Sequence, residues 1–279
     1  MGETAFGKRY IFQAILLFAL LPACSFAKET NILHEQPESK PICTDWAKHT
    51  LGKYEITNNV WGKGNIHDYS QCIYGALNPQ SDLPQRIGWS WNWPNTAEGV
   101  KAYPSILYGK KPWNDYSTTS RLPRAINQLS YLNVSFEVNS SSNGAVNLLL
   151  ESWVTKTAKA TPGERVGEVA IQLYQKNWPG QAGRFIESVV IDNIAYDFYI
   201  EKTMHVHGDK DTWVYYGFVH NGEAVLQVKT LDMMKFINYL VKHGYLNRKH
   251  YVASVELGNE IDHGEGRTEI KHFSVQVGR

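Results

Sequence analysis

Residues 251–277, YVASVELGNEIDHGEGRTEIKHFSVQV, place strand-forming residues on both sides of a glycine-rich centre. This pattern predicts a strand, a glycine-rich turn and a second strand. Because side chains alternate across a strand, Val255 and Leu257 should face a core, while Glu256 and Glu260 share the opposite face. Two carboxylates on one strand face either keep an exposed sheet soluble or carry out proton chemistry.

The chain from Cys43 onward is a series of short β-rich runs separated by Gly, Asn, Asp and Pro. Runs at this spacing, without helices between them, predict an antiparallel sandwich or barrel. No change of composition marks a second domain, so we expect one sandwich over residues 43–279. The runs lie at 54–61, 131–138, 146–154, 167–174, 184–191, 196–202, 212–219, 224–231 and 272–277.

Residues 231–244, LDMMKFINYLVKHG, are the exception to this β pattern. Their apolar residues recur at helical spacing, with Asp232 near the start and Gly244 at the end. We expect one amphipathic helix packed on the back of a sheet.

Carboxylates recur on other predicted strands. In residues 167–174, Glu168 lies on the face opposite the apolar residues, and in residues 146–154 Glu151 shares a face with Trp153. A solvated sheet face explains such a pattern equally well when the strands are considered alone.

Aromatic residues favour a second interpretation. The chain has 9 Trp and 16 Tyr, and GWSWNWPN, residues 88–95, places Trp89, Trp91 and Trp93 on one face of an extended segment. Indole rings stack on the apolar faces of sugars, and acids and amides bond to their hydroxyl groups. Aromatic residues beside acids therefore predict a sugar-binding cleft, although the same residues would also fill a sandwich core.

The N-terminus resembles a secretory signal peptide. Lys8 and Arg9 precede an apolar run, and Ser25 and Ala27 are small residues at the −3 and −1 positions for cleavage after residue 27. Acylation of Cys24, as in a lipoprotein, is the alternative. Residues 28–42 are polar and contain two prolines, which predicts a flexible leader. After cleavage the chain has no net charge, so nucleic acid and acidic lipid are poor partners.

Signal cleavage would also leave two cysteines, Cys43 and Cys72. An even pair in an exported chain predicts a disulfide.

These segments, in this order, resemble glycoside hydrolase family 12, a family of small jelly-roll endoglucanases and xyloglucanases. The opening segment carries Asn59, Trp61 and Gly62 between the two cysteines, and VKAYPSI, residues 100–106, is similar to the family's Lys-x-Tyr-Pro segment. Residues 146–154, 167–174 and 254–277 resemble its helper-acid, nucleophile and acid/base strands.

The resemblance implies a β-jelly-roll with a concave substrate cleft and a retaining endo-β-1,4-glucanase that needs neither metal nor cofactor. Glu168 would be the nucleophile, Glu260 the acid/base and Glu151 the residue that supports the nucleophile. The candidate substrate-binding residues are Asn59, Trp61, Trp89, Trp91, Trp153, Gln172 and Glu256.

Three positions depart from the family's pattern. Ala170 and Gln172 replace a Met and a Trp beside the nucleophile, which predicts the loss of a stacking platform there. Glu256 replaces an amide-like residue. It would raise the pKa of Glu260 by like-charge repulsion, or would itself be the proton donor.

Other functions stay open at this point. A non-catalytic carbohydrate-binding module would share the fold, and a xyloglucanase or xylanase would share the mechanism. A metal site at His205, His207 and Asp209 lacks evident partner ligands. We expect a secreted monomer that acts on a polysaccharide.

Overall fold

The computed structural model describes residues 40–77, 84–97, 99–204 and 212–279. The expected signal peptide, Cys24, nearly all of the leader and the His205, His207 and Asp209 motif lie outside these residues. Residues 39–279 form one compact unit. None of the helices in the described ranges has the length and apolar character that a bilayer crossing requires.

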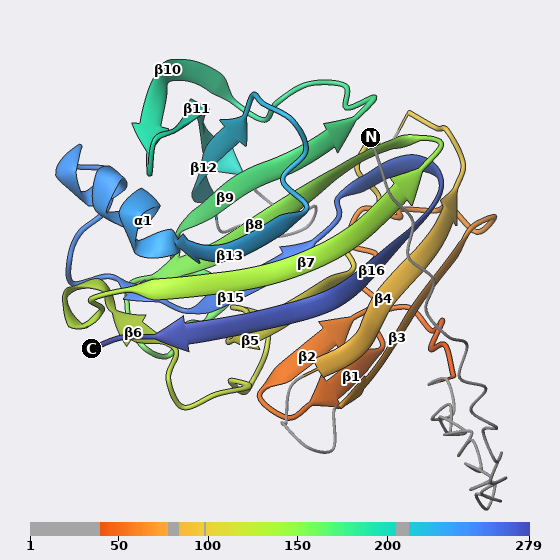
Figure 1. Ribbon diagram of the computed structural model, residues 1–279, viewed down its shortest axis with the longest axis horizontal. Helices are drawn as coiled ribbons and strands as arrows, with labels where there is room; N and C mark the ends of the chain where they lie inside the picture. Colours follow the sequence, from red (N-terminus) through yellow and green to blue (C-terminus); the bar gives the residue numbers. More distant parts are fainter. Residues whose placement is uncertain (1–39, 78–83, 98, 205–211) are drawn as a thin grey trace, which may run out of the picture. The chain divides into compact units, whose positions relative to one another are not determined.

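Two layers of strands make up this unit (Figure 1). We call them sheet A and sheet B. Sheet A has the order β3 (Ser70–Leu77), β4 (Pro84–Trp93), β16 (Ile261–Val277), β7 (Leu132–Ser142) and β13 (Gln227–Asp232). All of its pairs are antiparallel, and its apolar side chains alternate into the interior.

Sheet B is the larger layer. Its order is β1 (Lys48–Leu51), β2 (Tyr54–Thr57), β5 (Ser105–Gly109), β15 (Ser254–Gly258), β8 (Ala145–Thr155), β9 (Arg165–Lys176), β12 (Trp213–His220), β11 (Ile194–Met204) and β10 (Arg184–Ile191). The short strand β14 (Tyr251–Val252) pairs with one end of β8, and the short strand β6 (Arg124–Ala125) pairs with β14. Pairing is antiparallel except between β9 and β12, which are parallel. The expected two-layered β sandwich is therefore confirmed.

The predicted helix is α1 (Met233–Lys242), preceded by two short 3-10 helices elsewhere, η1 (Ile126–Gln128) and η2 (Pro162–Glu164). Asp232 caps α1, because its side chain accepts a hydrogen bond from the backbone N–H of Met234. Phe236 and Tyr239 pack edge-on against Phe218 of β12. Phe218 belongs to the core face of sheet B, so the helix covers the back of that sheet as expected.

The prediction of a glycine-rich turn within residues 251–277 is wrong. β16 runs unbroken through Gly264 and Gly266, and the chain turns earlier, at Asn259 and Glu260. The first residues of β16 pair with β8 of sheet B, and from Gly264 onward the strand pairs with β4 of sheet A. Gly264 has φ +93°. The glycines therefore bend one strand from one sheet into the other, rather than ending it (Figure 1).

The space between the sheets holds one large apolar core. Val169, Ile171, Val255 and Leu257 all lie in it, as their alternation predicted. The predicted disulfide joins Cys43 to Cys72, with a Cα–Cα distance of 4.0 Å. Closing a loop with a sequence separation of 29 contributes roughly 3–4 kcal/mol in the loop-entropy account.

Candidate active site

Four glutamates gather on the face of sheet B that points away from this core. Glu256 of β15 lies directly opposite Glu151 of β8, and Glu151 lies opposite Ala170 of β9. Glu168 is two residues before Ala170 and so shares its face. Glu260 follows β15 at the turn into β16. Strand register therefore brings together acids that are far apart in the chain. Glu168 and Glu260 are 92 residues apart, and Glu151 and Glu260 are 109 residues apart.

Asn147 of β8 holds Glu260 in place. Its side-chain Nδ2 donates to Glu260 Oε2 at 2.6 Å, and its Oδ1 accepts from the Glu260 backbone N–H at 3.1 Å. The Asn147 backbone N–H donates to the Glu260 carbonyl at 3.1 Å. Asn147 therefore holds Glu260, which follows the end of β15, by three hydrogen bonds, one of them to the carboxyl group.

Trp213 of β12 holds Glu168 in a similar way. Its indole Nε1 donates to Glu168 Oε2 at 2.7 Å. The parallel pairing of β12 with β9 places Tyr215 directly beside Glu168, which brings Trp213, two residues earlier, to the same acid. Trp213 is thus an aromatic neighbour of Glu168 supplied by another strand, and the loss of a stacking platform at Ala170 and Gln172 stays a prediction.

Trp213 belongs to an aromatic cluster formed by Trp113, Trp153, Trp213 and Arg165. The rings of Trp113 and Trp153 meet edge to face with centroids 4.9 Å apart, and those of Trp153 and Trp213 are 5.2 Å apart. The Arg165 guanidinium lies over both Trp113 and Trp213, at 4.8 and 4.5 Å from the ring centroids. Trp113 is 42% exposed and presents the cluster to solvent.

Exposure divides the four acids. Glu168 and Glu260 are half-buried, whereas Glu151 is 4% exposed and Glu256 is fully buried. Glu256 is bound by Lys111, whose Nζ lies 2.5 Å from Glu256 Oε2. The prediction that Glu256 binds substrate or donates a proton is therefore wrong, because a ligand outside the protein has no access to it.

Burial, rather than a neighbouring charge, is the main cause of the pKa shift at Glu260. Burial raises the pKa of Glu260, and the hydrogen bond from Asn147 works against that rise. Like-charge repulsion from Glu256 acts instead on Glu151 and Glu168.

Burial is also the main cause of the shifts in the other two acids. It raises the pKa of Glu168 to about 8, opposed by the Trp213 hydrogen bond and reinforced by the charge of Glu260. Burial, with the charges of Glu168 and Glu256, holds the pKa of Glu151 well above its usual range. The interacting acids lose their protons as a set, which retains protons to higher pH than exposed glutamates do.

Several predicted substrate-binding residues lie in the interior instead. Trp89 and Trp91 are 0% and 2% exposed and belong to the core between the sheets, so their assignment was wrong. Trp89 donates to Asn259 Oδ1 at 2.8 Å. Trp153 and Gln172 are also buried, which contradicts direct contact with a substrate. The alternation correctly placed Trp89 and Trp91 on one face of β4, but that face points into the core between the sheets.

Asn59 and Trp61 have different positions. Asn59 is buried and accepts a hydrogen bond from the Trp61 backbone N–H at its Oδ1, and its carbonyl accepts one from the Tyr103 backbone. Trp61 is 41% exposed. Asn59 thus shapes the turn that presents Trp61, and the contact of Trp61 with substrate stays a prediction.

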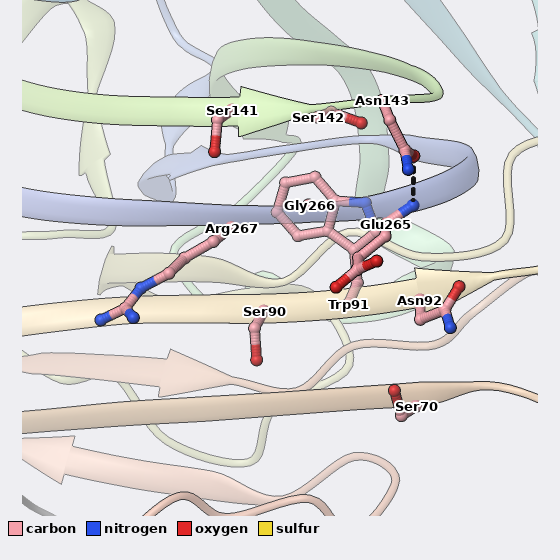
Figure 2. Close-up of a pocket in the computed structure, with 10 residues that line it drawn as sticks. All are labelled: Ser70, Ser90, Trp91, Asn92, Ser141, Ser142, Asn143, Glu265, Gly266 and Arg267. Atoms are coloured by element: carbon pink, nitrogen blue, oxygen red, sulfur yellow. Dashed lines mark hydrogen bonds between the residues drawn. The ribbon is translucent and has the colours of Figure 1, made fainter.

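A separate hollow of about 580 Å³ lies on sheet A (Figure 2). Strands β3, β4, β7 and β16 supply its mostly polar lining, and Asn143 accepts a hydrogen bond from the Glu265 backbone N–H there. None of the four clustered glutamates lines it. This hollow is distinct from the acids of sheet B.

Lys111, Asn147, Trp113 and Trp213 are site residues that the sequence interpretation missed. Asn147 sits within a predicted strand, directly before the apolar residues Leu148, Leu149 and Leu150, and only strand pairing reveals its partner. Lys111 and Trp113 lie in the segment after β5, which has no periodic pattern. The one signal that the sequence offered there was a tryptophan, Trp113, close to Lys110 and Lys111.

A sheet face that carries several interacting carboxyls beside tryptophans is suited to binding sugars, whose apolar faces stack on indole rings and whose hydroxyl groups bond to acids. The sequence model of glycosyl hydrolase family 12 matches residues 52–278. The chain belongs to this family, and it is a glycoside hydrolase of an endo-glucan-cleaving type.

Individual relatives agree with this placement. Endoglucanase S of Pectobacterium parmentieri is 29% identical over 227 residues, 81% of this chain and 82% of the relative. Xyloglucan-specific endo-beta-1,4-glucanase A of Emericella nidulans is 25% identical over 244 residues, 85% of this chain and 90% of the relative. The native family 12 xyloglucanase from Bacillus licheniformis superimposes with a TM-score of 0.76 at 28% identity, over 86% of this chain and all of that one. The expected jelly-roll fold is thereby confirmed.

Proposed function

We propose that this chain is an endo-β-1,4-glucanase that cleaves internal bonds of cellulose-type glucans with retention of anomeric configuration. The observation that carries the proposal is the division of the four acids by exposure. Glu168 and Glu260 are the two that keep part of their surface exposed on sheet B, where a substrate can reach them. A retaining enzyme needs two such carboxyls roughly 5–5.5 Å apart.

In the first step, Glu260 donates its proton to the glycosidic oxygen as the bond from that oxygen to C1 breaks. The ionised Glu168 carboxylate attacks C1 and forms a glycosyl ester. In the second step, water attacks C1, Glu260 accepts the water proton, and the ester bond to Glu168 breaks. The sugar leaves with its original configuration.

The remaining residues support these two. Glu151 lies on the strand next to Glu168, diagonal to it, and helps to retain a proton within the set, so that one acid is protonated while another is ionised. Trp213 orients Glu168, and Asn147 orients Glu260.

Substitution of each acid tests the assignment. We expect Glu260→Gln to lower kcat on carboxymethylcellulose by about 10²–10⁴-fold, the usual contribution of a general acid. Glu168→Gln should lower it at least as much, since no ester can form. Glu265→Gln on sheet A is the matched control and should retain full activity. Normal turnover in either site variant would remove that residue from the mechanism.

Azide distinguishes a covalent mechanism from direct attack by water. The variant Glu168→Gly opens room for azide at C1, so added azide should restore cleavage and give a glycosyl azide of inverted configuration. Rescue with retained configuration, or no rescue in a folded variant, would contradict the nucleophilic role of Glu168.

A xyloglucan-specific activity is the second candidate. The relative from Emericella nidulans and the neighbour from Bacillus licheniformis carry that activity in their names, whereas the Pectobacterium relative is an endoglucanase. Initial rates on carboxymethylcellulose, barley glucan, xyloglucan and xylan decide between the candidates. Binding of β-glucan without any cleavage would identify a carbohydrate-binding protein instead.

We further propose that the protein is secreted after cleavage of residues 1–27 and acts as a monomer. The basic, apolar and small-residue segments of the N-terminus support export. Mass spectrometry of the exported chain would give its first residue, and an acylated Cys24 would show a lipoprotein instead.

A further inference from the structure

The register of sheet B places one row of residues between Glu168 and Glu260. In this row Ala170 of β9 lies opposite Glu151 of β8, and Glu151 lies opposite Glu256 of β15. Strands β9 and β15 both pair antiparallel with β8, so they run in the same direction. Glu168 comes two residues before the row on β9, whereas Glu260 comes four residues after it, beyond β15. A glucan chain that passes between the two carboxyls therefore follows the row across the strands.

The same row continues beyond β9 to the edge of the sheet, where β10 lies (Figure 1). Ala170 pairs with Gly217 of β12, and Gly217 pairs with Tyr199 of β11. Tyr199 pairs in turn with Phe185 of β10. The order β9, β12, β11, β10 spans three strand spacings, or about 14 Å. Phe185 thus lies on the path of the chain, but away from the sugars that flank the bond to be cleaved.

Aromatic rings cover this outer part of the row. The Tyr215 ring lies over Gly217, because a Cβ on that glycine would be 2.6 Å from the ring carbon Cε1. The rings of Phe185 and Tyr199 meet edge to face, with centroids 5.6 Å apart and an interplanar angle of 69°. Tyr215 is 8% exposed, Tyr199 is half-buried and Phe185 is 48% exposed. The row therefore ends in an aromatic surface that opens to solvent.

Carboxylates lie on both sides of Tyr199. Asp197 and Glu201 are two residues before and after it, on the same face of β11. Ser188 Oγ donates to Asp197 Oδ1 at 2.6 Å. Thr203 Oγ1 donates to Glu201 Oε1 at 3.0 Å. Since sugars stack their apolar faces on aromatic rings and bond through their hydroxyl groups to acids, this surface offers both kinds of contact.

We propose that Phe185 and Tyr199 form an outlying binding site for a β-1,4-glucan chain, in which a sugar ring stacks on Phe185 while the bond to be cleaved lies between the two acids. The inference rests on the proposed function and adds to it a preference for long chains. A short substrate that fills the positions beside the acids does not reach β10.

Chain length is the variable that tests this site. We expect Phe185→Ala to lower kcat/KM on cellohexaose about 2- to 10-fold, the equivalent of one aromatic contact, and to leave kcat/KM on cellotetraose unchanged. Phe185→Trp, which keeps a ring, should retain the wild-type values. Val190→Ala is the matched control, because it removes an exposed apolar side chain from the same face of β10 outside the row. It should behave as the wild type on both substrates.

A purely structural role for Phe185 predicts another outcome. Loss of an outlying site changes where cellohexaose binds, so Phe185→Ala should also change the ratio of its cleavage products. An equal loss of kcat/KM on both substrates with an unchanged product ratio would overturn the proposal. So would a wild-type protein that sediments as a dimer and a Phe185→Ala variant that sediments as a monomer, since the ring would then be a contact between two copies of the chain.

Binding without cleavage separates this inference from the proposed function. Calorimetry on Glu168→Gln gives the Kd of cellotetraose and of cellohexaose, with and without the additional change Phe185→Ala. Weaker binding of cellohexaose alone in the double variant supports the site, even if the wild-type protein cleaves no β-glucan. Equal Kd values in the two proteins, or no binding of either sugar, overturn it, whatever the activity.

Discussion

At the scale of single residues, neighbours rather than residue type distinguish the four glutamates of sheet B. Glu256 is neutralised by Lys111 and closed off from solvent, and Glu151 is buried between two strands that also carry acids. Glu168 and Glu260 each accept a strong side-chain hydrogen bond and keep part of their surface exposed. That second pair is therefore the one that we propose to exchange protons with a substrate.

Trp113 is an exposed aromatic residue that contacts Trp153 and Trp213, and Trp213 in turn binds Glu168. An indole face at that position would stack on a sugar ring. We expect Trp113→Ala to raise KM for β-glucan about 2- to 10-fold, the equivalent of one aromatic contact, with little change in kcat. Steady-state kinetics measure both parameters.

The matched control for Trp113 is Tyr131→Ala, which removes a comparably exposed ring just before β7 of sheet A. Its KM should equal that of the wild type. An unchanged KM in Trp113→Ala would show that the substrate does not reach this ring.

At the scale of elements, β16 links the two sheets. Its first residues pair with β8, which carries Glu151, and its later residues form the middle of sheet A. Where it crosses, Gly264 packs against Gly144 of the turn between β7 and β8. A Cβ on Gly264 would lie 2.5 Å from the Gly144 Cα. The turn that holds Glu260 is anchored by this crossing.

Gly264→Ala should therefore destabilise the protein strongly. The left-handed backbone alone costs roughly 1–2 kcal/mol for an alanine, and the contact with backbone atoms adds to that cost. Chemical denaturation measures the free energy of unfolding.

Gly244→Ala isolates the backbone contribution. Gly244 ends α1 with φ +77° and has open space where its Cβ would lie. The variant Gly244→Ala should lose only about 1–2 kcal/mol of its free energy of unfolding. Equal losses in the two variants would show that crowding at the crossing contributes nothing.

At the scale of the whole molecule, folding buries the carboxyl set at a free-energy cost that depends on pH. The sandwich has a large apolar core and a disulfide, which together offset this cost. Since the folded state raises the pKa of Glu168 and Glu151 above the values of exposed glutamates, it binds protons more tightly than the unfolded chain does.

Stability should accordingly fall with rising pH. The stability contributed by a protonated Glu168 is complete below about pH 4.5 and is lost as the pH rises through about 8, the folded-state value. We expect Tm to decrease between pH 5 and pH 8, and to decrease less in Glu168→Gln, whose amide does not titrate. Differential scanning calorimetry across that range measures the slope.

Glu265→Gln on the exposed face of sheet A is the control for this slope and should follow the wild type. A Glu168→Gln slope as steep as that of the wild type would show that Glu168 does not hold its proton in the folded state.

The sequence predicted the fold class because its signals are local. Alternation assigned Val169, Ile171, Val255 and Leu257 to the core, and helical spacing identified α1. The same local signal failed for Trp89 and Trp91, since alternation identifies a shared face without saying whether that face meets solvent or the opposite sheet. It failed again at Gly264, where a glycine that bends a strand has the same local pattern as one that ends it.

By itself, the sequence of this protein determined which residues form strands, where the helix lies, which cysteines pair and which family the chain resembles. Tertiary structure alone decided which acids meet, because the register of β15, β8, β9 and β12 joins residues far apart in the chain. It also decided their chemistry. Burial, the Lys111 counter-ion and the Trp213 and Asn147 hydrogen bonds depend on distances of a few ångströms, and no pattern along the chain encodes those distances.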